Sequence, residues 1–206
     1  MMTLARHFVG AWQRRSIAID REPPSEPARV LWLQAGDAFA DLRVPEDPDA
    51  PIDAFAGITT YDAPALTWHH TLDRNGNFAD YDCGIVERHD EKLIERGEFE
   101  RDGCSHTYEE IWERIDPGNS GAVLTAAHAV VVRVGNHCLA LRDRRRAGGD
   151  FDVRHACITG QEWTDVTVLG DGTELPRPPV WLPSHWDTGS EVVIEGLHWR
   201  IAERWG

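Results

Sequence analysis

The sequence predicts an all-β protein in which an antiparallel meander closes into a barrel of about ten or more strands. Short segments rich in β-branched and aromatic residues recur about every 8–12 residues, with turn signals between them. Hardly any segment has the period of an amphipathic helix, and strands do not alternate with helices. The first strands carry apolar residues on both faces and charges on one, as in a barrel whose interior holds polar groups.

The first strand is expected over residues 8–19. Read with a period of two, Trp12 and Arg14 share one face and Arg15 lies on the other. The two adjacent arginines therefore cannot both point inward. We expect one of them to face the barrel cavity or to cap its end.

The second and third strands are expected at residues 29–34 and 38–44, joined by a turn that contains Gly36. Asp41 and Arg43 lie two residues apart, so they share a face and can form a pair or bracket a ligand. The alternative is a surface ion pair of little energetic value, because the other face of the same strand is an equally good core face.

The fourth and fifth strands are expected at residues 55–61 and 66–72. Trp68, His69 and His70 are consecutive, so the two histidines point to opposite faces and cannot bind one metal ion together. If Trp68 and His70 face inward, His70 is a candidate proton shuttle or axial ligand. The alternative is a buried histidine that is hydrogen-bonded to a neighbour.

Tyr108, Glu110, Trp112 and Arg114 fall on one face of a later strand. A carboxylate desolvated by tryptophan has a raised pKa and can act as a general acid or base; the alternative is a solvated glutamate. A proline-rich segment at 174–183 is expected to cross between strands. The later strands are expected at 82–89, 92–100, 105–115, 124–134, 137–143, 151–159, 162–169, 191–194 and 197–204.

We expect residues 1–206 to form a single barrel domain, and the alternative is two small barrels divided near 117–122. The net charge of −14 comes from 35 acidic and 21 basic residues, which argues against binding to nucleic acid or to anionic membranes. The N-terminus is too polar for a signal peptide and no apolar run is long enough to span a bilayer, so a cytoplasmic protein is expected.

No cofactor and no metal site are expected. The four cysteines are scattered and contain no Cys-x-x-Cys pair, so free thiols are expected, with a Cys83–Cys104 disulfide as the alternative. A metal site at His128, His137 or His155 would require a spatial coincidence that a sequence does not reveal.

The segment Gly10-Ala11-Trp12 resembles the calycin group, which comprises the lipocalins and the fatty-acid-binding-like barrels. Their first strand opens with Gly-x-Trp, and an arginine from the end of the barrel packs on that tryptophan. The resemblance covers about the first 45 residues and the last strand, where Arg200 or Arg204 would supply the arginine. It implies a barrel with one open end and a central cavity, whereas the lack of a signal peptide and of an obvious disulfide departs from the secreted lipocalins.

We therefore expect the barrel to bind a small hydrophobic or amphipathic molecule, with an anionic ligand allowed by Arg43. The alternative is a cofactor-free isomerase, cyclase or lyase that works by general acid–base catalysis. A third hypothesis is an interaction module that uses an outer face or the 174–183 segment. Nucleic acid and membranes are not expected partners, and a homodimer is allowed for. The candidate catalytic residues are His70 and Glu110, and the candidate ligand-binding residues are Trp12, Arg14, Asp41, Arg43, Trp68, Tyr108 and Trp112.

Overall fold

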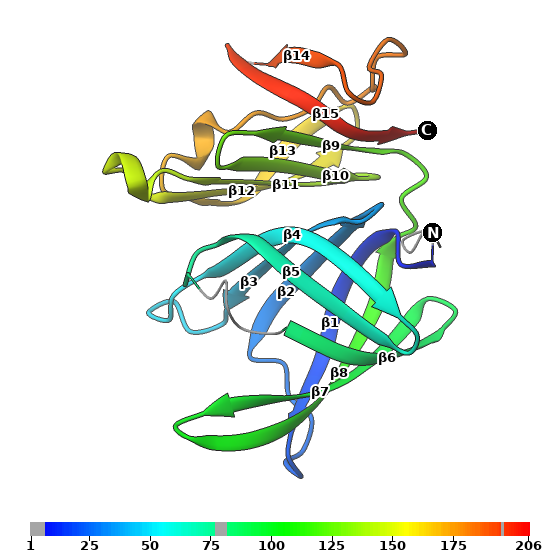
Figure 1. Ribbon diagram of the computed structural model, residues 1–206, viewed down its shortest axis with the longest axis vertical. Coiled ribbons are helices and arrows are strands. Elements are labelled where there is room, and N and C mark those ends of the chain that lie inside the picture. The colour runs from blue at the N-terminus through cyan, green and yellow to red at the C-terminus, as the bar shows by residue number, and fades with distance from the viewer. Residues whose placement is uncertain (1–6, 77–81, 195) are drawn as a thin grey trace.

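The computed structural model describes residues 7–76, 82–194 and 196–206, and it consists of antiparallel strands in two assemblies, a closed barrel and an open sheet (Figure 1). This confirms the predicted all-β class. Within those residues, no helix has the length and hydrophobicity needed to cross a bilayer.

The barrel contains eight strands in sequence order, and it closes because the first strand pairs with the eighth. The prediction of ten or more barrel strands was therefore wrong, because the later strands form a separate sheet. Turns such as Ala35-Gly36-Asp37 connect the barrel strands as a simple meander. The strands are β1 (Gly10–Ile19), β2 (Ala28–Ala35), β3 (Ala38–Pro45), β4 (Asp53–Asp62), β5 (Ala65–Asp73), β6 (Asp82–His89), β7 (Lys92–Arg101) and β8 (Cys104–Asp116).

The second assembly is a seven-stranded sheet in the order β13-β12-β11-β10-β9-β15-β14. The single strand predicted at 124–134 is in fact two strands that pair as a hairpin, and His128 adopts a left-handed conformation (φ 57°) in the turn. That turn contains no glycine, so the sequence pattern at 124–134 gave no turn signal. The strands are β9 (Gly121–Ala126), β10 (Ala129–Val134), β11 (His137–Asp143), β12 (Phe151–Thr159), β13 (Glu162–Leu169), β14 (Glu191–Ile194) and β15 (Leu197–Trp205), with short 3-10 turns at Arg145–Ala147 and Gly172–Glu174.

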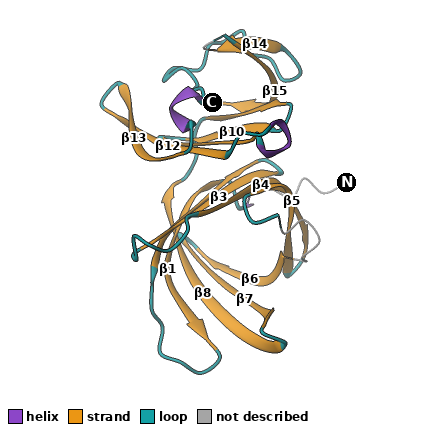
Figure 2. Ribbon diagram, turned by 90° about the vertical axis from the view of Figure 1, so that its left-hand side faces the viewer, coloured by secondary structure: helices purple, strands orange, loops and turns teal. Residues whose placement is uncertain are grey.

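The sheet packs on one side of the barrel, over β2 to β5 (Figure 2). Leu31 and Leu33 point out of the barrel and pack in one core with Val132 and Leu139 of the sheet. Trp32, between them in sequence, points into the barrel. The strand is therefore apolar on both faces because it contributes to two cores.

The opposite face of the sheet forms a third core. Trp199 and Leu124 lie there beside Leu175 and Trp186, which belong to the long connection between β13 and β14. The predicted proline-rich crossing at 174–183 is part of this connection. Both faces of the sheet are thus covered by apolar side chains.

One end of the barrel is closed around Trp12, which is fully buried and donates its Nε1–H to the carbonyl oxygen of Phe8 (2.7 Å). The guanidinium of Arg114 lies 5.7 Å from the centre of the Trp12 ring. A Cβ atom at Gly10 would lie 2.7 Å from the Arg114 side chain, so this close approach requires glycine.

The expectation that Arg200 or Arg204 covers Trp12 was wrong. Both residues belong to β15, which pairs with β9 in the sheet. The arginine comes instead from β8, the last strand of the barrel rather than of the chain.

Candidate ligand-binding cavity

A cavity of about 720 Å³ occupies the other end of the barrel. Every barrel strand except β2 contributes to it, and a small recess at its inner end reaches the tryptophans of the barrel core. The main cavity is lined by Arg14, Ile17, Ile19, Arg43, Asp53, Phe55, His70, Asp73, Asp82, Cys83, Glu95, Glu98, Phe99, Glu100, Arg101, Ser105, Tyr108 and Glu110. The recess is lined by Trp32, Asp41, Arg43, Phe55, Trp68, Asp82, Glu95 and Trp112.

Arg14 is the inward member of the adjacent arginine pair. Its side chain is only 6% exposed, whereas that of Arg15 is 45% exposed. Arg14 forms an ion pair with Glu110 from β8 and a second one with Glu26 (Nε–Oε2 2.9 Å). Its buried positive charge is therefore balanced by two carboxylates, which is the condition under which burial of a charge is tolerated.

Asp41 and Arg43 point inward and pair with each other, with 3.0 Å between Arg43 Nε and Asp41 Oδ1. Burial raises the pKa of Asp41 to about 6, although the attraction of Arg43 opposes the shift. The guanidinium of Arg43 lies over the ring of Phe55, 4.8 Å from its centre. Arg43 borders both the main cavity and the recess, so it sits at the junction between them.

His70 lies between two carboxylates and stacks on Phe55, with the ring centres 4.3 Å apart. Its Nδ1 is 2.7 Å from Asp73 Oδ2 and its Nε2 is 3.3 Å from Asp82 Oδ2. Burial by itself lowers the pKa of His70, but the hydrogen bonds to the two carboxylates outweigh burial and raise it to about 9. The imidazole is therefore cationic at neutral pH. His69 faces outward, where its Nε2 meets the hydroxyl of Thr60.

Glu95 is a buried carboxyl group at the inner end of the cavity. Its oxygens accept hydrogen bonds from the Tyr108 hydroxyl (2.7 Å) and from Trp112 Nε1–H (3.1 Å). Burial raises the pKa of Glu95 well above its usual range, and the neighbouring Glu110 and Asp82 raise it further. Its protonated form is therefore favoured relative to that of a glutamate in water.

Aromatic rings form the floor below this acid. Trp32 contacts Trp68 and Trp112 edge to face, with ring centres 5.7 Å and 5.8 Å apart, and it stacks on Trp12 at 5.9 Å. These pairs form an interlocked cluster. In the recess, Trp32, Trp68 and Trp112 lie beside charged side chains, so aromatic and ionisable groups both border the inner end of the cavity.

The structure brings together the candidate residues of the sequence analysis, apart from Trp12. Those that border the main cavity or the recess are Arg14, Asp41, Arg43, Trp68, His70, Tyr108, Glu110 and Trp112. Trp12 lies at the closed end of the barrel.

Sequence reasoning missed six acidic residues of the lining, which are Asp53, Asp73, Asp82, Glu95, Glu98 and Glu100. Glu95 shares the inner face of β7 with Leu93 and Phe99, and this alternation was a usable signal. Asp73 and Asp82 stand at strand ends, where the alternation stops.

A separate polar cluster lies between the barrel and the sheet and contains His137, His155 and Cys157. The Cys157 sulfur is 3.3 Å from His137 Nδ1 and 3.4 Å from His155 Nε2. Burial lowers the pKa of both histidines, that of His155 to about 3, so both are neutral at neutral pH. His128 is at the exposed turn between β9 and β10 and does not take part. All four cysteines are free thiols.

A family model described as Protein HRI1 matches residues 11–203. The chain belongs to this family. The match spans the barrel and the sheet together, so the family comprises the whole two-part fold rather than the barrel alone.

A crystal structure of an uncharacterised protein from Saccharomyces cerevisiae has the same fold, with a TM-score of 0.76 and 15% identity, covering 96% of this chain and 99% of that one. No curated protein matches the chain. The structural similarity to the yeast protein establishes the fold, so function has to be argued from the cavity.

Proposed function

We propose that this member of the family binds a small amphipathic molecule in the barrel cavity, with the apolar part of the ligand on the tryptophan floor. The cavity volume of about 720 Å³ carries the proposal, because it lies within the range of pockets that enclose small ligands. A cavity of this size gives up packing contacts that a well-packed domain would otherwise make, unless a ligand or solvent fills it. The calycin resemblance belongs to the same proposal and is supported by the packing of Arg114 on Trp12.

The charges around the cavity favour a neutral or cationic polar group over an anionic one. Arg14 and Arg43 are already paired with carboxylates, and His70 lies between two more. Carboxyl groups outnumber arginines and histidine in the lining as a whole. An anionic ligand would have to displace one of these pairs or be held by the exposed Arg101 alone, whereas a hydroxyl or ammonium group finds acceptors in place.

A matched series of probes tests this proposal: octyl glucoside, octyltrimethylammonium and octanoate share the same chain and differ in head group. We expect the first two to change the tryptophan fluorescence saturably, and octanoate to bind about tenfold more weakly because of its charge. Equal binding of all three, or binding of octanoate alone, would contradict the proposed head-group preference. Failure of all three to bind would contradict binding of an amphipathic ligand.

Cysteine alkylation locates the bound probe. Cys83 lines the cavity, and Cys104 lies exposed at the start of β8 outside the lining. A bound probe should slow the alkylation of Cys83 and leave that of Cys104 unchanged. Equal rates for both thiols, with and without a saturating probe, would place the binding elsewhere.

A second candidate function is cofactor-free acid–base catalysis, and the raised pKa of the buried Glu95 beside the cavity supports it. Glu110 is a weaker candidate because it forms an ion pair with Arg14, and His70, being protonated, would act as an acid rather than a base. If a ligand that co-purifies with the protein is chemically converted on incubation, Glu95→Gln should abolish that conversion and retain binding. We place either function in the cytoplasm, which the free cysteines support.

A further inference from the structure

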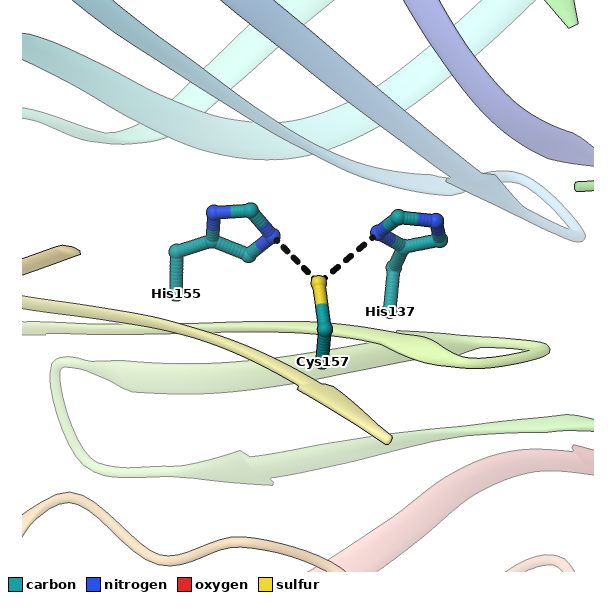
Figure 3. Close-up of side chains that lie close together, drawn as sticks. All are labelled: His137, His155 and Cys157. Carbon is teal, nitrogen blue, oxygen red and sulfur yellow. Dashed lines mark hydrogen bonds between the residues drawn. The ribbon is translucent and has the colours of Figure 1, made fainter. Parts of the chain in front are cut away.

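The cluster of His137, His155 and Cys157 arises from strand register. β11 and β12 are antiparallel neighbours, and His137 lies directly opposite Cys157 in their pairing. His155 precedes Cys157 by two residues, so both side chains lie on the same face of β12. Figure 3 shows the three side chains rising from the sheet toward the barrel strands, with both rings turned toward the sulfur.

The three groups contact one another through the Cys157 sulfur. The thiol can donate its hydrogen to one imidazole nitrogen and accept an N–H from the other, so the cluster is held by two hydrogen bonds to sulfur, which is a weak donor and a weak acceptor. His155 is only 6% exposed, and its other nitrogen, Nδ1, has no partner within the described residues. An unpartnered buried nitrogen is costly, but a cation held by Nε2 does not reach Nδ1, so an ion site is inferred from the three atoms that face one another.

We propose that His137, His155 and Cys157 bind one zinc ion, with a fourth coordination position left for water. Two imidazole nitrogens and a thiolate are donors that zinc prefers and that calcium and magnesium do not. A single cation would engage one lone pair from each of the three groups at once, in place of two weak hydrogen bonds to sulfur. On binding, the thiol proton leaves to solvent and the sulfur–metal bond takes its place.

The distances fit this ion. Tetrahedral zinc with bonds of about 2.3 Å to sulfur and about 2.0–2.1 Å to nitrogen separates sulfur from nitrogen by about 3.6 Å. The observed separations are 3.3 Å and 3.4 Å, and the three ligand atoms all lie within 4.8 Å of one another. The two rings are nearly parallel, at 20°, with their centres 6.1 Å apart across the sulfur. Both nitrogens would have to turn toward a common point beside the sulfur to bind one ion.

The surrounding charges modulate the site in opposite directions. Arg29, on β2 of the barrel, acts electrostatically on His155 and Cys157, and Asp116 acts on His137. Arg29 is exposed and is held by a hydrogen bond from its Nη2 to the Thr167 hydroxyl. A cation bound to the cluster is repelled by Arg29 and attracted by Asp116. Arg29→Gln should therefore tighten zinc binding several-fold without removing a ligand.

Cobalt(II) titration of the full-length protein is the direct test, because a cobalt–thiolate bond gives a charge-transfer band in the near ultraviolet. We expect one equivalent to produce this band together with the visible bands of four-coordinate cobalt, and zinc to displace it. Cys157→Ser should abolish the charge-transfer band, and His137→Gln should weaken binding about 10- to 100-fold or more. Cys83→Ser, which changes a thiol of the barrel, is the matched control and should leave the band unchanged.

A second measurement on the unmodified protein covers the case in which Cys157→Ser does not fold. Zinc should slow the alkylation of Cys157, measured by peptide mass spectrometry, with Cys83 and Cys104 as internal references that do not respond. A band that survives Cys157→Ser would overturn the proposal. So would cobalt binding without a thiolate band, or an alkylation rate of Cys157 that zinc does not change.

Discussion

The two faces of the barrel strands are built from alternate residues of the same segments, and they differ in charge and in packing. On β3 the inner face carries Asp41 and Arg43, paired beside the cavity, and the outer face carries Ala40 and Leu42, packed against the sheet. The inner face is hollow and charged, and the outer face is solid and apolar. A charge is tolerated on the inner face because a partner meets it there, whereas the outer face offers no such partner.

Substitutions on the two faces should therefore change the stability of the protein by different mechanisms. Stability on the inner face rests on paired charges, so removing one member leaves the other buried without a partner. Stability on the outer face rests on contact area and close packing, so removing atoms there leaves a cavity.

Arg14→Ala is the largest perturbation of the inner face. It leaves Glu110 buried without its cation, and we expect the free energy of unfolding to fall by about 3–5 kcal/mol. Arg15→Ala is the matched control, since its exposed pair with Glu113 contributes about 0–1 kcal/mol. Urea denaturation measures both variants. Equal effects would show that the two faces of β1 do not differ as described.

Leu33→Ala tests the outer face. Leu33 is fully buried between the barrel and the sheet, and its truncation should lower the free energy of unfolding by about 2–5 kcal/mol. Ile58→Ala is the control, because Ile58 is 50% exposed and should change stability by about 0.5 kcal/mol or less.

The shared core also predicts that barrel and sheet unfold together. Tryptophan fluorescence and circular dichroism should report the same urea midpoint in the unmodified protein. Two separate transitions would mean that the outer face does not join the two assemblies into one folding unit.

The pH dependence of stability tests His70. Its pKa is about 9 in the folded protein and about 6.5 in the unfolded chain, so folding favours the protonated form. The stabilisation is complete below about pH 6.5 and is lost as the pH rises through about 9, amounting to about 3 kcal/mol at most. His70→Gln should flatten the curve of unfolding free energy against pH over this window. His69→Gln, on the exposed side of the same strand, should leave the slope as it is.

Much of the barrel interior was predictable because a strand has a period of two and tryptophan marks the inner face. Trp68 identifies His70 in this way, and Trp112 identifies Glu110 and Tyr108. Glu95 was missed because its strand has no tryptophan to mark a face. The arginine over Trp12 was misassigned because a sequence does not show which strand closes the barrel.

The histidine–cysteine cluster depends on information that local patterns do not contain. His155 and Cys157 form a readable His-x-Cys pair on one strand face. The third member, His137, joins them only through the register of β11 against β12, which the connection at residues 144–150 determines. A shift of that register by one residue would turn His137 to the other side of the sheet.

The closure of β1 onto β8 has a consequence for how the chain is made. Ala11 pairs with Asp116, so synthesis must have passed residue 116 before the barrel can close. Pairings between such distant residues form slowly. If the barrel closes before the strands of the sheet are translated, the apolar outer face around Leu33 and Leu42 has nothing to cover it at that stage. The nascent chain then exposes the apolar residues of its second core to solvent, and this is the stage at which a chaperone would have most to protect.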